Sequence, residues 1–484
     1  MKKYYIKTFG CEMNKADSEK INMILLQSGL IKTSEWRDAD LVIYNTCSVR
    51  QKWEDRVFGM SEEIRKENAQ REIDGNPKRI ITGITGCMVR KTWLHKMYLA
   101  EDINRKRARK IQYITDKNGI FNNDDKLFPR LESLDFTLRI EEVKYLSFIL
   151  THIHWEAIWS DDKFDDYLKS KQLRENPYSA SVIVQTWCDN YCTFCIVPYT
   201  RGKEISRSHD EIISEARELV ANGTKEISLV WQNVNSYWKQ SNIKLWNEEK
   251  SMWNDGLWKS PFRKLLDDLN ELEGLDRIRF TSSNPHDMTQ DILDAHHKLD
   301  SSCNYLHFAL QSGSNTLLKK MNRRHTYEDF KKQVEYLRSK DPFFSISTDI
   351  IVWYSWETEE MFQDTIKAFR ECEFDFAYTA RYSVRKGTIA SKIYPDDVPD
   401  SVKAERWHIL NDVLLENVIK RNGRMLDSVQ EILVNWFKDW YYFWRTRNFK
   451  EVFFKAEEGS VKVWDLVNVK LVELDRYVIK GELV

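Results

Sequence analysis

Three cysteines stand close together in the segment C-D-N-Y-C-T-F-C, which contains Cys188, Cys192 and Cys195. The spacing C-x3-C-x2-C lets one loop present three thiolates to a 4Fe-4S cluster and leaves the fourth iron without a protein ligand. An iron with a vacant position can hold and reduce S-adenosylmethionine, so the cofactor itself would carry the radical chemistry. The spacing therefore predicts a radical cluster in a loop that follows a strand at 181–185.

A zinc site is the main alternative for this loop. Structural zinc sites take four ligands, usually as two pairs of Cys or His residues. No fourth Cys or His lies close by, because the nearest downstream histidine is His209. Three ligands without a fourth favour the cluster over zinc.

A second set of three cysteines, Cys11, Cys47 and Cys87, is dispersed over the first ninety residues. Dispersed cysteines can also be small buried side chains, which is how we interpret Cys303 and Cys372. Each member of the second set, however, follows an apolar run typical of a strand, at 4–9, 41–44 and 80–84. Parallel strands end at one edge of a sheet, where α/β domains build their sites. We therefore expect these three thiolates to meet and to hold a second cluster.

The segments around both sets resemble those of one family, the radical S-adenosylmethionine methylthiotransferases, and within it the MiaB type that modifies tRNA. The resemblance rests on T-F-G-C-E-M-N-K-A-D-S-E at 8–19, N-T-C-S-V-R at 45–50, T-G-C-M at 85–88 and Y-C-T-F-C-I-V-P-Y-T-R-G at 191–202. Q-N-V-N-S-Y at 232–237 is the version typical of the tRNA branch. The resemblance covers nearly the whole chain.

This resemblance implies a tRNA modification enzyme. The implied reaction is methylthiolation of C2 of N6-dimethylallyladenosine (i6A to ms2i6A) at tRNA position 37, in the anticodon loop. It would use two 4Fe-4S clusters and S-adenosylmethionine, with the sulfur coming from the second cluster and an electron from a flavodoxin or a ferredoxin-like protein. The alternatives are a threonylcarbamoyl-adenosine tRNA or a ribosomal protein as substrate, or an inactive RNA-binding relative.

The predicted fold class is α/β with three domains. Strands alternating with helices at 178–423 indicate a parallel barrel, and short alternating strands at 428–483 indicate a small β-barrel. The resemblance implies a methylthiotransferase domain at 1–160, a linker at 161–177, a partial (β/α)6 radical core at 178–423, and a small RNA-binding β-barrel of the TRAM type at 424–484. Polar residues at the carboxyl ends of the core strands are the expected cofactor-binding set: Gln232, Asn233, Ser283, Gln311 and Asp349. A basic cluster in the last domain, Arg445, Arg447 and Lys450, is the expected RNA contact.

Composition places the chain among core-forming proteins of balanced charge. It has 74 Lys and Arg against 75 Asp and Glu, and 42% of its residues are hydrophobic. No apolar run approaches the roughly 18 residues that a membrane span needs, and the first residues lack the apolar core of a signal peptide. Cysteines arranged as cluster ligands fit a reducing cytoplasm. The resemblance and the balanced charge favour a monomer.

Tryptophan and glycine occur in unusual numbers, with 18 Trp and only 16 Gly in 484 residues. Glycine usually makes up about 7% of a globular protein, and here the two residue types together reach that share. Seven tryptophans stand where the family has glycine: Trp187, Trp231, Trp238, Trp353, Trp356, Trp444 and Trp464. Our hypothesis is that UGA codons read as glycine in the source organism are written here as tryptophan. The alternative is a genuinely tryptophan-rich variant, whose altered radical site would favour the inactive relative.

Overall fold

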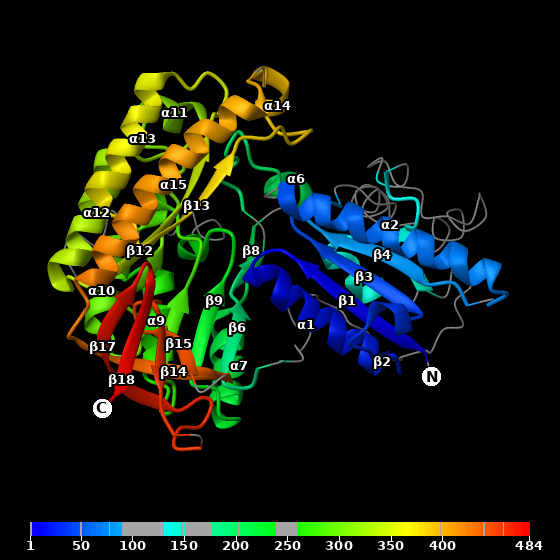
Figure 1. The fold of residues 1–484 in the computed structure, drawn as a ribbon, viewed down its shortest axis with the longest axis horizontal. Helices are drawn as coiled ribbons and strands as arrows, with labels where there is room; N and C mark the ends of the chain where they lie inside the picture. The colour runs from blue at the N-terminus through cyan, green and yellow to red at the C-terminus, as the bar shows by residue number, and fades with distance from the viewer. Residues whose placement is uncertain are drawn as a thin grey trace. The chain divides into compact units, whose positions relative to one another are not determined.

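The computed structural model describes residues 2–48, 51–76, 78–89, 127, 130–146, 149–150, 174, 176–186, 188–201, 204–238, 259–396, 398–438, 441–457 and 459–484. The chain forms two compact units (Figure 1). The amino-terminal unit comprises residues 1–175, 187–189 and 195–203, and the barrel unit comprises the remainder. Most of the predicted linker, and Trp187, lie outside the described residues.

A five-stranded parallel sheet forms the centre of the amino-terminal unit. Its order is β2-β1-β3-β4-β5. The strands are β1 (Lys3–Phe9), β2 (Ile31–Lys32), β3 (Leu41–Thr46), β4 (Ile81–Gly86) and β5 (Phe136–Thr137). Every residue of β3 is buried, as expected for a central parallel strand covered on both faces.

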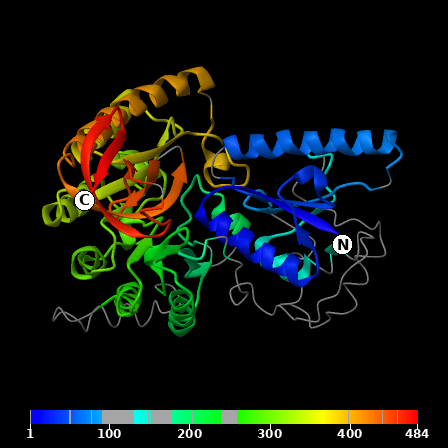
Figure 2. The same ribbon diagram turned by 60° about the horizontal axis from the view of Figure 1, so that its bottom comes forward.

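Two helices cover the two faces of this sheet. Helix α1 (Glu12–Gln27) connects β1 to β2, and α2 (Gln51–Ile73) connects β3 to β4. The two crossovers leave the centre of the sheet in opposite directions, so right-handed connections place the helices on opposite faces. Figure 2 shows this arrangement, with α2 above the sheet and α1 below it. Because one crossover leads from β1 to β2 and the other from β3 to β4, the strand order reverses between β1 and β3.

Six parallel strands form the core of the barrel unit. They are β6 (Ser179–Ile183), β9 (Glu226–Val230), β10 (Arg277–Phe280), β11 (Tyr305–His307), β12 (Ser345–Val352) and β13 (Phe376–Arg381). They pair as β10-β9-β6 and β11-β12-β13, and isolated bridges such as Ile278 to Ser302 and Ser283 to Phe308 link β10 to β11. A short hairpin of β7 (Gln185–Thr186) and β8 (Ile205–Ser206) follows β6.

Helices alternate with these strands, and the sequence marks where several of them begin. The major helices are α7 (His209–Ala221), α9 (Pro261–Asn270), α10 (Gln290–Lys298), α12 (Tyr327–Lys340), α13 (Glu359–Cys372) and α15 (Asp400–Gly423), with shorter ones at α6 (Val197–Arg201), α11 (Asn315–Lys320) and α14 (Ala390–Ile393). Ser208, Thr326 and Thr358 each accept a hydrogen bond from a backbone N–H of the first turn. The alternation confirms the predicted α/β core.

The last strands close into a small barrel. They are β14 (Val429–Lys438), β15 (Tyr441–Thr446), β16 (Glu451–Lys455), β17 (Leu466–Asp475) and β18 (Val478–Leu483), in the order β14-β15-β16-β18-β17. All neighbouring pairs are antiparallel except β16 with β18. This is the strand order of an OB-type barrel, and it confirms the predicted β-barrel at the carboxyl end.

Two buried arginines of β10 fasten this small barrel to the parallel strands. Arg277, which is fully buried, donates to the carbonyl oxygens of Arg445 and Glu431 at 2.9 and 3.1 Å. Arg279 donates to the carbonyls of Arg447 and Thr446, both at 2.9 Å. A carbonyl oxygen carries no full negative charge, so carboxylates supply the counter-charges. Glu431 pairs with Arg277 at 2.8 Å, and Glu226 pairs with Arg279 at 2.7 Å.

A second buried charge cluster surrounds Asp375, the residue directly before β13. Its carboxylate lies 2.7 Å from Lys450, 3.2 Å from Arg421 and 3.1 Å from Arg338. Burial opposes ionisation, but the three cations outweigh it and hold the pKa of Asp375 at about 2. Lys450 belongs to the small barrel, Arg421 to α15 and Arg338 to α12, so one carboxylate ties three elements together.

We expect Asp375→Asn to destabilise the protein by about 3 kcal/mol, because it leaves three buried cations without their counter-charge. Chemical denaturation at pH 7 measures this. Asp375 is ionised in the folded protein down to about pH 2 and protonates in the unfolded chain near pH 4. Its stabilisation is therefore present above about pH 4 and fades as the pH falls towards 2. Equal stabilities of the two proteins at pH 7 would contradict the role given to this cluster.

Several tryptophans have a backbone conformation that favours glycine. Trp238, Trp353, Trp356 and Trp464 have φ values of 61°, 58°, 71° and 77°. A side chain in this left-handed region brings Cβ against the following carbonyl, at a cost of roughly 1–2 kcal/mol. Trp356 also exposes 58% of its surface, so its ring gains little from burial.

Trp356 allows this strain to be measured. We expect Trp356→Gly to be more stable than Trp356→Ala by about 1 kcal/mol, because both lose the ring and only Gly relieves the left-handed backbone. Trp407, inside α15, provides the matched control. There the order should reverse, with Gly about 1 kcal/mol less stable than Ala. An alanine variant at 356 as stable as the glycine variant would show that this backbone carries no strain.

None of the described helices is long and apolar enough to cross a lipid bilayer.

Candidate functional site

The dispersed cysteines all lie at the carboxyl edge of the amino-terminal sheet. Cys47 directly follows β3, Cys87 directly follows β4, and Cys11 stands two residues after β1. The three strands are parallel and end in register, with Phe9 opposite Thr46 and Thr46 opposite Gly86. In a sheet of order 2-1-3-4-5, ligands bind at the crevice where the strand order reverses, between β1 and β3. The three cysteines thus follow the same edge of the sheet.

Two buried asparagines hold the loops that carry Cys11 and Cys47. The Asn14 side chain donates to Asn45 Oδ1 at 3.0 Å and to the Thr46 carbonyl at 3.1 Å. Asn45 in turn donates to the Asn14 carbonyl at 2.7 Å. Asn14 also accepts from the Cys11 backbone N–H at 3.3 Å and lies 3.5 Å from its sulfur. Sequence reasoning missed both residues, although each lies within three residues of a cysteine.

The third loop of the edge is held by Thr46. The Cys87 backbone N–H donates to the Thr46 carbonyl at 2.8 Å, and the Thr46 hydroxyl donates to the Thr85 carbonyl at 2.6 Å. Gly86, between Thr85 and Cys87, has φ +90°, and a Cβ there would lie 2.2 Å from the Thr46 carbonyl oxygen. Only glycine allows this approach. No group of three His, Cys, Asp or Glu side chains among the described residues encloses a single metal ion.

The second cysteine of the close set lies in a loop that the barrel unit holds firmly. Thr193 donates to the Met321 carbonyl from its backbone and to the Lys320 carbonyl from its hydroxyl, at 3.1 and 2.9 Å. The Asn322 side chain donates to the carbonyls of Asn190 and Tyr191. Main-chain groups on both sides of Cys192 are therefore fixed by the turn at 320–322.

A guanidinium lies beside Cys192. Arg323 Nη1 is 3.6 Å from its sulfur, and Nη2 is bonded to the Ala309 carbonyl. A cation at this point complements the negative charge of an iron-thiolate cluster. Cys188 and Cys195 are both partly exposed. Cysteine thiolates are the usual ligands of iron-sulfur clusters, so the residue type suits the predicted cluster, although the described side chains do not gather around one metal position.

The expected cofactor-binding residues end neighbouring strands of the barrel unit. Asn233 is 2% exposed and donates from Nδ2 to Asp287 at 2.7 Å, while its Oδ1 has no partner among the described residues. The Oε1 of Gln232 and the hydroxyl of the fully buried Ser283 are likewise buried without a partner there. Buried polar atoms are normally hydrogen-bonded. These three fit a polar ligand above β9 and β10.

The other two members of the set lie on the following strands. Gln311 has φ 76° and its backbone N–H donates to the Asp349 carbonyl at 2.8 Å. The Asp349 carboxylate is 37% exposed and lies 3.0 Å from Nε2 of His307, the last residue of β11. His307 was missed by sequence reasoning, because a single histidine in a strand-like run gives no signal of its own.

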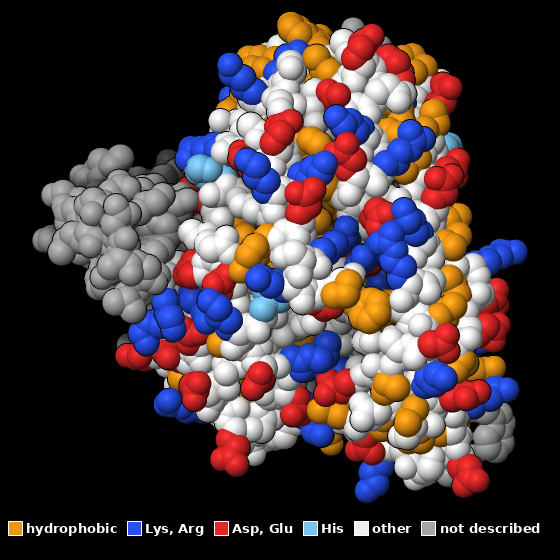
Figure 3. All heavy atoms as spheres, turned by 90° about the vertical axis from the view of Figure 1, so that its left-hand side faces the viewer, with side chains coloured by type: hydrophobic (Ala, Val, Ile, Leu, Met, Phe, Trp, Pro, Cys, Tyr) orange, Lys and Arg blue, Asp and Glu red, His pale blue; other side chains and the backbone are white. Residues whose placement is uncertain are grey.

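The three basic residues of the small barrel have different surroundings. Lys450 is buried and bound to Asp375, and Arg447 donates to the Ser302 carbonyl at 3.1 Å. Both side chains therefore support the protein's own packing. Arg445 is 29% exposed, lies 4.0 Å from the Phe449 ring and pairs with Glu451. On the face in Figure 3, blue and red side chains are interspersed rather than gathered by sign.

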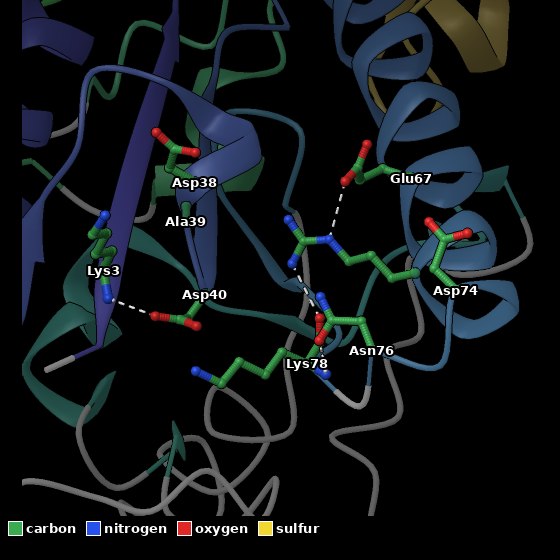
Figure 4. Close-up of a pocket in the computed structure, with 9 residues that line it drawn as sticks. Lys3, Asp38, Ala39, Asp40, Glu67, Asp74, Asn76 and Lys78 are labelled. Atoms are coloured by element: carbon green, nitrogen blue, oxygen red, sulfur yellow. Dashed lines mark hydrogen bonds and ion pairs between the residues drawn. The ribbon is translucent and has the colours of Figure 1, made fainter.

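A polar groove of about 440 Å³ lies at the opposite end of the amino-terminal sheet (Figure 4). It is lined by Lys3 at the start of β1, by Asp38 and Asp40 before β3, and by residues near the end of α2. The Lys3 backbone N–H donates to the Asp40 carboxylate at 2.7 Å, and Arg71 pairs with Glu67 at 3.0 Å. The cysteines follow the other ends of these strands, so the groove is separate from the candidate site.

Two family models and one solved structure match parts of the chain. The model of the Radical SAM superfamily matches residues 182–369, and that of the uncharacterized protein family UPF0004 matches residues 3–103. The solved structure of the radical S-adenosylmethionine methyltransferase TsrM from Kitasatospora setae aligns with 81% of this chain and 77% of its own chain. The two are 13% identical, with a TM-score of 0.45.

Curated relatives match from end to end. The tRNA-2-methylthio-N(6)-dimethylallyladenosine synthase of Caldicellulosiruptor saccharolyticus is 36% identical, over 100% of this chain and 93% of that protein. The enzyme of the same name from Protochlamydia amoebophila is 35% identical, over 100% of this chain and 96% of that protein. These matches confirm the resemblance seen in the motifs: the chain belongs to the family of tRNA-2-methylthio-N(6)-dimethylallyladenosine synthases.

Proposed function

We propose that this protein inserts a methylthio group at C2 of N6-dimethylallyladenosine in tRNA, at position 37. The observation that carries this is the placement of Cys11, Cys47 and Cys87 at one sheet edge, in a chain that also has the C-x3-C-x2-C loop. Radical generation needs one cluster and sulfur insertion needs another. The end-to-end match to relatives of that name supports the same reaction.

Cys188, Cys192 and Cys195 would hold the radical cluster. When bound, the two 4Fe-4S clusters and S-adenosylmethionine supply the electron, the radical, the methyl group and the sulfur. The protein's own part is to fix the loop and its charge. The turn at 320–322 holds the backbone around Cys192, and Arg323 places a positive charge beside its sulfur.

Cys11, Cys47 and Cys87 would hold the second cluster. Their positions depend on backbone hydrogen bonds between adjacent strands and on the Asn14 and Asn45 side chains. These contacts join α1, β3 and β4 without any ligand, so they would hold the three loops in place for a cluster. Such preorganisation reduces the ordering that cluster binding requires.

Gln232, Asn233, Ser283, Gln311 and Asp349 would bind S-adenosylmethionine. The cofactor has an amino group, a carboxylate, ribose hydroxyls and an adenine, so it offers donors and acceptors to the buried oxygens of Gln232, Asn233 and Ser283. Hydrogen bonds to the cofactor would remove the cost of leaving those oxygens unpaired.

The substrate is an anticodon loop, whose unpaired bases are accessible without opening a duplex. Of the three basic residues expected to contact RNA, Arg445 has a partly exposed guanidinium, and Arg447 and Lys450 are engaged within the protein. We therefore assign RNA contact to Arg445. A flavodoxin or ferredoxin-like electron donor, a monomeric state and a cytoplasmic location belong to the same proposal.

Substitution of one cysteine from each set separates the two clusters. We expect Cys192→Ser to abolish cleavage of S-adenosylmethionine, because the radical cluster loses a ligand. Cys47→Ser should retain that cleavage and yield no methylthiolated tRNA. Iron content should fall from about eight to about four per chain in each variant. Anaerobic reconstitution, iron analysis and product detection by mass spectrometry measure all three.

Cys372→Ala is the matched control. Burial raises the pKa of the Cys372 thiol to about 11, so it stays protonated and unsuited to iron. This variant should keep both clusters and the full reaction. Methylthiolation by Cys47→Ser at the wild-type rate would contradict the proposed function.

A further inference from the structure

Tryptophan is over-represented among residues with a left-handed backbone. Twelve described residues other than glycine have positive φ, and four of them are tryptophan. Tryptophan makes up 18 of 484 residues, so fewer than one in a set of twelve is expected. Positive φ is uncommon outside glycine, asparagine and aspartate, and it is a genuine outlier for a bulky residue. The excess therefore has a cause specific to tryptophan.

The main chain of these residues is used, whatever the side chain. Trp353 N donates to Glu357 Oε2 at 2.7 Å in the turn after β12. Trp238 N donates to the Ser206 hydroxyl at 3.0 Å, and Trp464 N donates to the Val434 carbonyl at 2.5 Å. Each of these residues combines a left-handed backbone with a hydrogen-bonded N–H. Glycine meets both requirements without strain.

The indoles make contacts that do not require this backbone. Trp353 and Trp238 donate from Nε1 to the carbonyls of Val402 and Arg207, both at 2.9 Å. Trp464 stacks on Tyr178 at 5.3 Å. A large ring at a turn can make contacts of this kind with many different backbone conformations. Trp231, by contrast, is 2% exposed and its indole N–H has no acceptor among the described residues.

We propose that Trp238, Trp353, Trp356 and Trp464 are glycine in the protein as its own cells make it. The codons at these positions would be UGA, read there as glycine and written as tryptophan under another code. The same reading applies to Trp187, Trp231 and Trp444. A smaller residue at 231 would widen the space next to Gln232 and Asn233, in the set assigned to the cofactor.

Peptide mass spectrometry of the protein from its own cells tests this. We expect glycine at 238, 353, 356 and 464, and tryptophan at the control position 407, whose helical ring donates to the Thr379 carbonyl. Tryptophan at the four positions would overturn the proposal. The coding triplets give an independent result, since UGA supports the proposal and UGG contradicts it.

A separate observation concerns His307, which lies in a chain of hydrogen bonds inside the barrel unit. Tyr305 OH lies 2.7 Å from the Ser347 hydroxyl, which lies 2.8 Å from His307 Nδ1. His307 Nε2 lies 3.0 Å from the Asp349 carboxylate. One tautomer satisfies every link: Tyr305 donates to Ser347, Ser347 donates to Nδ1, and Nε2–H donates to Asp349.

The geometry points to His307 as a positioning residue for Asp349. The carboxylate is partly exposed, whereas the histidine behind it is buried and fixed on its other side. An ionised acceptor held in one orientation binds a polar cofactor with less loss of freedom than a mobile one. This inference rests on the proposed function, in which Asp349 contacts S-adenosylmethionine.

Equilibrium dialysis of S-adenosylmethionine with the reconstituted protein tests it. We expect His307→Ala to raise the Kd by about tenfold, the loss of one charge-assisted hydrogen bond. His307→Gln, which keeps a donor, should recover part of the affinity. The KM for S-adenosylmethionine should rise with little change in the kcat of its cleavage.

Tyr336→Phe is the control, because it removes a hydrogen bond to Asp294 between α12 and α10. Its Kd should equal that of the wild type. If His307→Ala binds as tightly as the wild type, the positioning role is wrong and the proposed function stands. A reconstituted wild type that binds no S-adenosylmethionine would contradict both.

Discussion

The in-register pairing of β1, β3 and β4 is the constraint on which the site proposed for Cys11, Cys47 and Cys87 depends. Because the three strands are parallel, the residues that follow them reach the same edge, although they are up to 76 positions apart in sequence. The strand order reverses between β1 and β3, the position at which open α/β sheets bind their ligands. Asn14, Asn45 and Gly86 then hold the loops that carry the cysteines.

Buried charge plays the corresponding structural role in the barrel unit. Arg277 and Arg279 direct guanidinium groups at carbonyls of the small barrel, and Asp375 gathers three cations from separate elements. Isolated buried charges would be costly, but each here has a counter-charge or several hydrogen bonds. The small barrel is therefore part of the same packed unit as the parallel strands, and it uses two of its basic residues in that packing.

Residues with a regular pattern were predictable from the sequence. The strand-like runs before Cys11, Cys47 and Cys87 predicted three parallel strands, and the short alternating runs after residue 428 predicted a barrel. Contacts between distant polar residues were not predictable. Lys450 was taken for an RNA contact because it belongs to a basic cluster in a stretch that resembles an RNA-binding barrel, and only folding brings it to Asp375. His307 and Asn45 gained their roles in the same way, through partners 42 and 31 residues away.

The central claim is that two clusters in one chain carry out a methylthiolation of tRNA. The most direct measurement is to incubate the anaerobically reconstituted, reduced protein with S-adenosylmethionine and a prenylated tRNA, then digest the tRNA and analyse its nucleosides by mass spectrometry. The account predicts conversion of N6-dimethylallyladenosine to its 2-methylthio derivative, with none in a matched tRNA that lacks the prenyl group. Cleavage of S-adenosylmethionine without any change in the prenylated nucleoside would contradict it.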